Sequence, residues 1–291
     1  METNASPQHV TTISGRLITR PSRYALVTKV ARSAWEEQAA KVAIEKELWQ
    51  LIEELVAIVP VKRTSIPADV MILKSHMFLV NKYSADGSFD KVKARLVADG
   101  RDQDAELFPN KSSPAVAIHS VFTVLSLACQ KHWRVVAKID IKGAFIQTPM
   151  TSPPIYMKLD PRITRMAKEL YPEFNEFIWD DSCLYTILLK AMYGCVQESA
   201  LWYALIRSVI EGMNYTVSET DKCVFMKQVG DRVYLLLLYV DDILAVVDAE
   251  EAARLKAKLE KLFRTIQFEE GDNLSYLGMD VMIKVYSDLL L

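Results

Sequence analysis

Two adjacent carboxylates, Asp241 and Asp242, stand between two apolar runs at residues 233–240 and 243–247. Continuous apolar runs of this length are typical of buried strands, whereas aspartate favours turns. The pattern therefore predicts a β-hairpin with the acid pair at its tip. Two like charges this close repel each other unless a cation lies between them and a partner, although a polar hairpin turn without any chemistry explains this short motif equally well.

A third carboxylate, Asp140, ends a strand-like segment at residues 133–140, and Gly143 marks a turn after it. If this strand is a neighbour of the hairpin in one sheet, Asp140, Asp241 and Asp242 converge at a single edge. Three hard oxygen donors suit Mg²⁺, which leaves its other coordination positions to water and substrate phosphate. The combination suggests two-metal phosphoryl transfer.

The elements that must position these acids follow from hydrophobic periodicity and turn signals. In order, we expect a helix at 31–59 that one break could interrupt, a hairpin of strands 77–81 and 92–98 around Asp86-Gly87, a helix opened by Ser113-Pro114, the strand 133–140, an irregular connection 151–182 with a short strand at 155–158, and helices at 198–212 and 250–265. On the helix after Pro114, the face expected to pack on the core carries Ile118, Val121, Phe122, Leu125 and Ala128. This order favours an α+β fold whose helices back an antiparallel sheet.

Composition excludes several classes of protein. With 291 residues, 51% of them hydrophobic, the chain can bury a large core. Its longest apolar stretch, 233–247, is broken by the two aspartates and falls short of the roughly 18 apolar residues of a membrane span. The polar N-terminus lacks the features of a signal peptide. We therefore expect an intracellular protein that is not bound to membranes.

Neither the cysteines nor the histidines suggest a site. No Cys-x-x-Cys spacing occurs and no histidine is placed to complete a zinc site, so the cysteines are expected to be free and mostly buried. They are Cys129, Cys183, Cys195 and Cys223.

Positive and negative charges are nearly equal over the whole chain but are unevenly distributed along the sequence. The net charge of -2 argues against a nonspecific nucleic-acid binder. Basic residues nevertheless gather on the predicted hairpin, and the ordinary explanation of such a cluster is a solvated face. They are Lys82, Lys91, Lys93 and Arg95, with Arg101 just beyond.

Five ordered segments carry a family resemblance. They are Lys93-Ala-Arg-Leu-Val-Ala98, Asp140-Ile-Lys-Gly-Ala-Phe145, residues 192–203 (Met-Tyr-Gly-Cys-Val-Gln-Glu-Ser-Ala-Leu-Trp-Tyr), Tyr239-Val-Asp-Asp242 and Tyr276-Leu-Gly278. Together they resemble the motifs of reverse transcriptases, specifically the copia-type polymerases of LTR retrotransposons. The resemblance implies a right-hand polymerase with palm, fingers and a truncated thumb, which carries out RNA-directed DNA synthesis.

The same resemblance implies roles for the acids. Asp140 and Asp241 would be the principal ligands of two Mg²⁺ ions, for which Mn²⁺ is a substitute. The backbone carbonyl of Ile141 would assist, and Asp242 would complete the acidic cluster.

It also implies a binding site for the incoming deoxynucleoside triphosphate. Lys93 and Arg95 would contact the triphosphate, although neighbouring strand positions alternate faces and only some can point inward. Phe145 would lie beneath the sugar and exclude a 2′-hydroxyl, whereas alone it is more often a core aromatic. Tyr193 and Gly194 would line the pocket, the glycine letting the backbone approach the base pair. Trp202 and Tyr203, by contrast, are expected to be core residues of a helix.

The chain departs from the family pattern at several positions. Val196 stands where a lysine is common, Ser199-Ala200 where proline-arginine is common, and Asp99 where a basic residue is usual. Each change removes positive charge from a surface expected to meet template or nucleotide. A catalytically inert transposon-derived remnant that binds nucleic acid or protein is therefore one alternative, and another two-metal palm enzyme such as a nucleotidyl cyclase is a second.

The domain organisation and partners follow from the resemblance. Residues 1–30 are expected to form a loose arm and 31–285 the reverse transcriptase domain, with 31–130 mainly fingers and 131–285 mainly palm and the start of the thumb connection. The expected partners are an RNA template, a DNA primer and deoxynucleoside triphosphates. The ribonuclease H and integrase regions of an intact element have no counterpart in these residues, so a fragment of a Pol polyprotein is expected.

Overall fold

The computed structural model describes residues 37–283 apart from 85–86, 105, 107, 109–111, 131–132 and 151–152, together with residues 9–11, 17–19, 27–30 and 35. Most of the predicted N-terminal arm and the predicted turn residue Asp86 therefore lie outside the described residues. Helices and sheets alternate along the described chain, and the predicted α+β class is confirmed.

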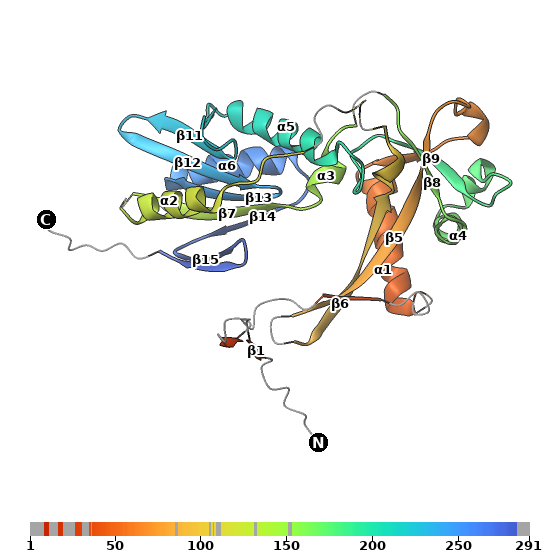
Figure 1. The fold of residues 1–291 in the computed structure, drawn as a ribbon, viewed down its shortest axis with the longest axis horizontal. Helices are drawn as coiled ribbons and strands as arrows, with labels where there is room; N and C mark the ends of the chain where they lie inside the picture. Colours follow the sequence, from red (N-terminus) through yellow and green to blue (C-terminus); the bar gives the residue numbers. More distant parts are fainter. Residues whose placement is uncertain are drawn as a thin grey trace, which may run out of the picture.

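Two lobes lie side by side, each around its own hydrophobic core (Figure 1). We call the first the antiparallel lobe, because every neighbouring pair of strands in its sheet is antiparallel. Its strands in spatial order are β10 (Thr216–Val217), β11 (Val224–Val229), β12 (Arg232–Tyr239), β13 (Asp242–Val247), β7 (Val135–Ile141) and β14 (Ile266–Glu270).

Helices and a small hairpin enclose this sheet. In Figure 1, α5 runs along its upper side and the β15–β16 hairpin lies below it. The central strands read as apolar runs because both of their faces are covered, and β13 is buried from Ile243 to Val247. The covering elements are α2 (Ile118–Cys129), α5 (Glu198–Glu211), α6 (Ala249–Leu262), β15 (Asn273–Tyr276) and β16 (Met279–Met282).

The second lobe, which we call the mixed lobe, contains one parallel pair of strands, β5 with β8. Its sheet follows the order β3 (Val27–Lys29), β5 (Ile72–Tyr83), β8 (Tyr156–Leu159), β9 (Leu184–Leu188) and β4 (Ile58–Pro60), and β6 (Phe89–Ala98) pairs with β5. The long β5–β6 hairpin confirms the predicted one and extends it at both ends.

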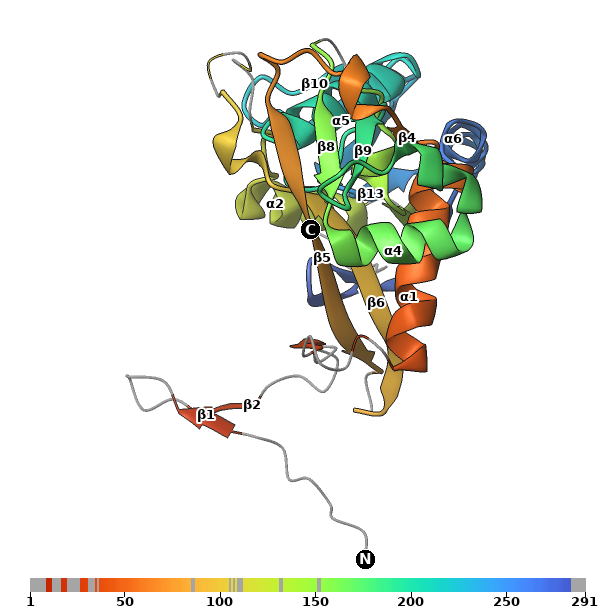
Figure 2. The ribbon, with the colours of Figure 1, turned by 90° about the vertical axis from the view of Figure 1, so that its right-hand side faces the viewer.

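A helix packs beside the outer strand of this hairpin, β6. Figure 2 shows α1 (Gln38–Trp49) lying beside β6. The buried Glu47 carboxylate accepts a hydrogen bond of 2.9 Å from the Leu96 N–H of β6, so this edge of the hairpin is capped by a side chain. Such a bond satisfies a backbone donor that a free sheet edge would leave unpaired.

The predicted helix at 31–59 is correct in its middle and wrong at its end. After α1 the chain makes a π-helical turn, Gln50–Glu54, and then enters β4. Ile58 and Val59 therefore belong to a strand, because β4 pairs with β9 in the mixed sheet. Residues 31–34 of the predicted helix lie outside the described residues.

The helix expected to open at Ser113-Pro114 instead begins at Ile118, with Ala117 at its N-cap position. Its buried face carries Val121, Val124 and Ala128, whereas Ile118 and Phe122 are each 55% exposed. The buried face of this helix therefore differs from the predicted one, in which Ile118 and Phe122 were expected to face inward.

The connection at 151–182 is more regular than expected. It contains β8, the helix α4 (Pro161–Leu170) and a 3₁₀ segment, Pro172–Phe177. Asp160 caps α4 by accepting hydrogen bonds from the N–H groups of Arg162 and Ile163, with Pro161 at the first helical position. Abundant proline and acid suggested a loop, but here these residue types start a helix.

The two hydrophobic cores are not formed by the residues before and after position 130, respectively. Core residues of the antiparallel lobe come from 116–144 and 202–283, and those of the mixed lobe from 35–98 and 146–195. The short helix α3 (Ala144–Gln147) joins them, with Ala144 in one core and Ile146 in the other. Among the described helices, none is long and apolar enough to span a membrane.

Candidate active site

Asp140 and Asp242 lie directly opposite each other on β7 and β13. Residues paired in this way point to the same face of an antiparallel sheet, with Cβ atoms about 4.5–5.5 Å apart. The strand that carries Asp140, which ends one residue later at Ile141, is thus a neighbour of the acid-bearing hairpin, as the sequence predicted. The two carboxylates meet at one end of the central strands.

The hairpin tip differs from the prediction in one respect. Tyr239 pairs with Asp242, so the two-residue turn consists of Val240 and Asp241, and Asp242 is the first residue of β13. Val240 has φ +54°, which fits the first turn position of a II′ hairpin. The Ile141 N–H donates a hydrogen bond of 3.0 Å to the Asp241 carbonyl, which ties the turn to the strand that carries Asp140.

Electrostatics links the three acids. Burial raises the pKa of Asp241, and the charge of Asp140 raises it further. Burial also raises the pKa of Asp242, an effect that Lys138 opposes. A cation at this edge would therefore relieve repulsion between carboxylates that are already partly removed from water.

Two lysines that the sequence analysis missed neutralise the acids. The Lys142 ammonium group donates a hydrogen bond to Asp140, and the Lys138 Nζ lies 3.8 Å from Asp242 Oδ1. Lys138 is two residues before Asp140 on β7, so alternation along the strand could have placed both on one face. Within the described part of the chain, no three His, Cys, Asp or Glu side chains are grouped so as to hold a metal ion.

Lys93 and Arg95 lie on one face of the β5–β6 hairpin. They are two residues apart on β6 and oppose Val80 and Phe78 of β5, respectively. All four line a cavity of about 420 Å³, so both cations face the same open space. Burial, with Arg95 close by, lowers the pKa of Lys93.

Arg95, Tyr193 and Phe145 form a continuous row of contacts. The Arg95 guanidinium lies 4.2 Å from the centre of the Tyr193 ring, and the Phe145 ring stands perpendicular to Tyr193 with centroids 5.8 Å apart. Arg95 also lowers the pKa of Asp241 through its charge, an effect smaller than that of burial. Three residues predicted to bind nucleotide are therefore brought together from three separate segments.

Gly194 has a packing role. Its φ is +89°, and an added Cβ would lie 2.1 Å from the Ala98 carbonyl oxygen at the end of β6. Next to it, the Ala98 N–H donates a hydrogen bond of 2.7 Å to the Tyr193 carbonyl. Glycine is needed here because two backbone segments touch.

Glu198 is a further residue of this region that the sequence analysis missed. Its Oε2 accepts a hydrogen bond of 2.7 Å from the Gly194 N–H. Burial raises the pKa of Glu198 to about 7, whereas this bond and the charge of Arg95 lower it. Nothing in the sequence distinguished this acid, since glutamate is ordinary in the first turn of a helix.

The departures from the family pattern have local partners. Asp99 forms an ion pair with Arg101 at 2.6 Å and a hydrogen bond of 3.1 Å with His76 Nε2. The Val196 N–H donates a hydrogen bond of 2.9 Å to Gln103 Oε1. Asp99 therefore adds little free negative charge to its surroundings.

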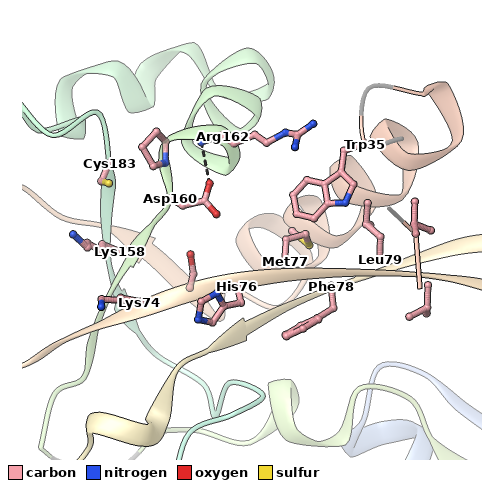
Figure 3. A pocket seen from close by; sticks show the side chains of 14 residues that line it. Trp35, Lys74, His76, Met77, Phe78, Leu79, Lys158, Asp160, Arg162 and Cys183 are labelled. Atoms are coloured by element: carbon pink, nitrogen blue, oxygen red, sulfur yellow. Dashed lines mark hydrogen bonds between the residues drawn. The ribbon is translucent and has the colours of Figure 1, made fainter. Parts of the chain in front are cut away.

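A larger cavity, of about 790 Å³, lies on the mixed lobe and is not lined by Asp140, Asp241 or Asp242 (Figure 3). It is bounded by β5, the start of α4 and Trp35. The Arg162 guanidinium lies over the Trp35 ring, 4.7 Å from the ring centroid. None of the predicted site residues lines the cavity.

Comparisons with known proteins agree with the motifs. A family model described as reverse transcriptase (RNA-dependent DNA polymerase) matches residues 63–287. The Retrovirus-related Pol polyprotein from transposon RE2 of Arabidopsis thaliana is 30% identical over 217 residues, which cover 74% of this chain and 14% of that polyprotein. The Retrovirus-related Pol polyprotein from transposon TNT 1-94 of Nicotiana tabacum is 30% identical over 207 residues, which cover 69% of this chain and 14% of that polyprotein.

A more distant relative is the Transposon Ty1-H Gag-Pol polyprotein of Saccharomyces cerevisiae, 26% identical over 217 residues, which cover 70% of this chain and 10% of that polyprotein. The chain thus spans a small part of the length of the curated relatives that it matches. Because the family model matches most of the chain and the plant polyproteins are 30% identical to it, the chain belongs to the reverse transcriptase (RNA-dependent DNA polymerase) family, in its copia-type retrotransposon branch.

Proposed function

We propose that this chain catalyses RNA-directed DNA synthesis, with transfer of a nucleotide from a deoxynucleoside triphosphate to a primer 3′-hydroxyl. In this proposal the antiparallel lobe is the palm and the mixed lobe forms the fingers, with an RNA template and a DNA primer between them. The observation that carries the proposal is the cross-strand pair of Asp140 and Asp242, with Asp241 tied to the same strand through Ile141.

The donor set suits Mg²⁺, with Mn²⁺ as a substitute. Asp140 and Asp241 would hold two ions, assisted by Asp242 and the Ile141 carbonyl, and hard carboxylate and carbonyl oxygens are the ligands that Mg²⁺ prefers. The ammonium groups of Lys138 and Lys142 already lie against Asp242 and Asp140, so this edge attracts positive charge. Once bound, the ions would activate the primer hydroxyl and stabilise the leaving oxygens.

The basic face of the β5–β6 hairpin would bind the triphosphate. Lys93 and Arg95 share one side of a cavity, where their donors would stabilise the negative charge that develops during transfer. Phe145, in edge contact with Tyr193, would lie under the sugar and exclude a 2′-hydroxyl. Gly194 would keep the adjoining backbone close to this pocket.

A second candidate function is a remnant that binds nucleic acid or protein without catalysis. Glu198 favours it, since its carboxylate lies near Arg95 in the region assigned to the anionic triphosphate. The uncharged Val196, Ser199 and Ala200 also leave this segment without the cations that are common in the family.

Primer extension distinguishes these functions. On a poly(rA) template with an oligo(dT) primer, the protein should incorporate dTTP in the presence of Mg²⁺. Asp241→Asn removes the charge of one ligand while keeping its shape, and should lower the rate at least about 10³-fold, in line with the loss of a principal metal ligand.

The matched control is Asp231→Asn, the same chemical change at an exposed turn between β11 and β12. This variant should retain the wild-type rate. Unchanged extension by Asp241→Asn would refute the proposed catalytic site, and template binding without incorporation by the wild type would establish the remnant. A cyclic nucleotide as the product would instead identify a cyclase.

A further inference from the structure

The turn that presents Asp241 has an unfavourable backbone conformation. Val240 has φ +54°, in the left-handed region that glycine adopts easily and a β-branched side chain rarely adopts. Such a conformation persists only where surrounding contacts hold it in place. Because Asp241 is the next residue, relaxation of Val240 would move its carboxylate.

One of those contacts comes from α5. The Trp202 indole Nε1–H donates a hydrogen bond of 2.6 Å to the Val240 carbonyl. Trp202 is only 1% exposed, and its ring lies edge-on to that of Phe263 at an interplanar angle of 65°, with centroids 5.5 Å apart. Phe263 directly follows α6, so the donor is fixed between two helices.

A second contact holds the other turn residue. The Ile141 N–H donates to the Asp241 carbonyl at 3.0 Å. The two central carbonyls of the turn are therefore held independently, one by the strand that carries Asp140 and one by the indole. Trp202 is expected from the sequence only to be a core residue of a helix, and its burial is confirmed.

We propose that Trp202 is a positioning residue, whose indole N–H holds the Val240-Asp241 turn in the conformation that directs the Asp241 carboxylate toward Asp140. This inference rests on the proposed function, because the geometry it preserves is that of the acid cluster. Trp202 does not touch substrate or metal; it acts through the Val240 carbonyl. Small displacements of a reacting group are costly, about 10²-fold in rate for a shift of 1 Å.

Trp202→Phe tests the hydrogen bond while keeping an aromatic ring in the core. We expect kcat for dTTP incorporation to fall at least about tenfold, with KM for dTTP changed much less, because the residues predicted to contact the nucleotide lie outside α5. The matched control is Tyr203→Phe on the same helix, which removes a hydrogen bond of 2.8 Å from the Tyr203 hydroxyl to the Lys222 carbonyl. This control should leave kcat unchanged.

Rescue distinguishes positioning from general loss of packing. Glycine adopts a positive φ without strain, so Val240→Gly should make the turn less dependent on its indole contact. The double variant Trp202→Phe with Val240→Gly should therefore recover most of the kcat that Trp202→Phe loses. A double variant as slow as Trp202→Phe would overturn the proposal, as would wild-type kcat in Trp202→Phe.

Mn²⁺ binding provides a readout that does not need polymerase activity. Measured by electron paramagnetic resonance, Mn²⁺ affinity should fall about tenfold in Trp202→Phe and recover in the double variant. If the wild type binds Mn²⁺ but extends no primer, the proposed function fails. The Mn²⁺ titration then still tests the positioning role, because it compares the affinities of wild type and Trp202→Phe without requiring polymerase activity. Equal affinity in wild type and Trp202→Phe would refute the role.

A shape-conserving substitution covers the case in which Trp202→Phe does not fold. Benzothienylalanine at position 202 replaces the indole N–H by sulfur and keeps the bicyclic ring. It should show the same fall in Mn²⁺ affinity with near-wild-type thermal stability. Wild-type Mn²⁺ affinity in this variant would count against the hydrogen bond.

Discussion

Glu198 shows how one half-buried carboxyl can couple the candidate site to pH. Its side chain bonds to the Gly194 N–H, close to Arg95, Tyr193 and Cys195, and burial raises its pKa to about 7. In the unfolded chain this pKa returns to an ordinary value, which is 4.5 for glutamate. The folded protein therefore holds a proton on Glu198 over a pH range in which the unfolded chain has lost it.

This difference predicts the sign of a pH effect on stability. The stabilisation that comes from protonated Glu198 is complete below pH 4.5 and is lost as pH rises toward 7. Between pH 5 and pH 8, the free energy of unfolding of the wild type should fall relative to Glu198→Gln by on the order of 1–2 kcal/mol, a value reduced for partial solvent screening. Urea unfolding of both proteins across this range measures the difference, and a difference independent of pH would contradict the assignment.

At this scale, residue type and spacing predicted part of the candidate site. Asp140, Asp241 and Asp242 could be placed together, because apolar runs that end on acids predict neighbouring strands with their acids at one edge. The hydrogen bond from Trp202 to the Val240 carbonyl could not be predicted in this way. It depends on which distant segment approaches the acids, and nothing in the local pattern of residues encodes that approach.

At the scale of elements, capping explains both an error and an omission. The helix expected at Ser113-Pro114 begins four residues later, at Ile118, and the side chain of its N-cap residue, Ala117, forms no cap bond. The helix α4, by contrast, was missed although Asp160 and Pro161 form a regular helix start. Local start signals compete with tertiary packing, and for α2 the packing of Val121, Val124 and Ala128 decided where the helix runs.

The Asp160 cap carries a measurable part of the stability of α4. Asp160 accepts hydrogen bonds of 2.9 and 3.0 Å from the N–H groups of Arg162 and Ile163. Asp160→Ala should lower the free energy of unfolding by about 1 kcal/mol, because two backbone donors lose their acceptor. The matched control is Glu37→Ala at the N-cap of α1, where no side-chain cap bond exists, and it should have little effect. Equal losses in the two variants would show that the Asp160 bonds contribute nothing.

At the scale of the whole molecule, the part of the chain that the structure describes passes between the lobes three times. It crosses between residues 98 and 116, within α3, and between residues 195 and 202. A boundary near residue 130 could not describe this arrangement, because each core is assembled from two separate stretches of sequence. Periodicity reports which face of an element is apolar, but not which core that face joins.

The first and third crossings touch each other through glycines. An added Cβ at Gly194 would lie 2.1 Å from the Ala98 carbonyl oxygen, and one at Gly100 would lie 2.2 Å from the Gly194 carbonyl oxygen. Both clashes are with backbone, which cannot move aside as a flexible side chain can. The starts of these two crossings are therefore packed against each other as closely as backbone allows.

Gly194→Ala should disrupt this backbone contact. Gly230→Ala is the matched control, because Gly230 also has a positive φ, +57°, but has no atom within 4 Å of the added Cβ. Backbone strain is thus common to the two variants, whereas only Gly194→Ala forces two segments apart. We expect Gly194→Ala to lose at least about 2 kcal/mol more free energy of unfolding than Gly230→Ala, the range typical of overpacked positions. Urea unfolding followed by circular dichroism measures both losses, and equal losses would mean that the segments at Ala98 and Gly194 separate without cost.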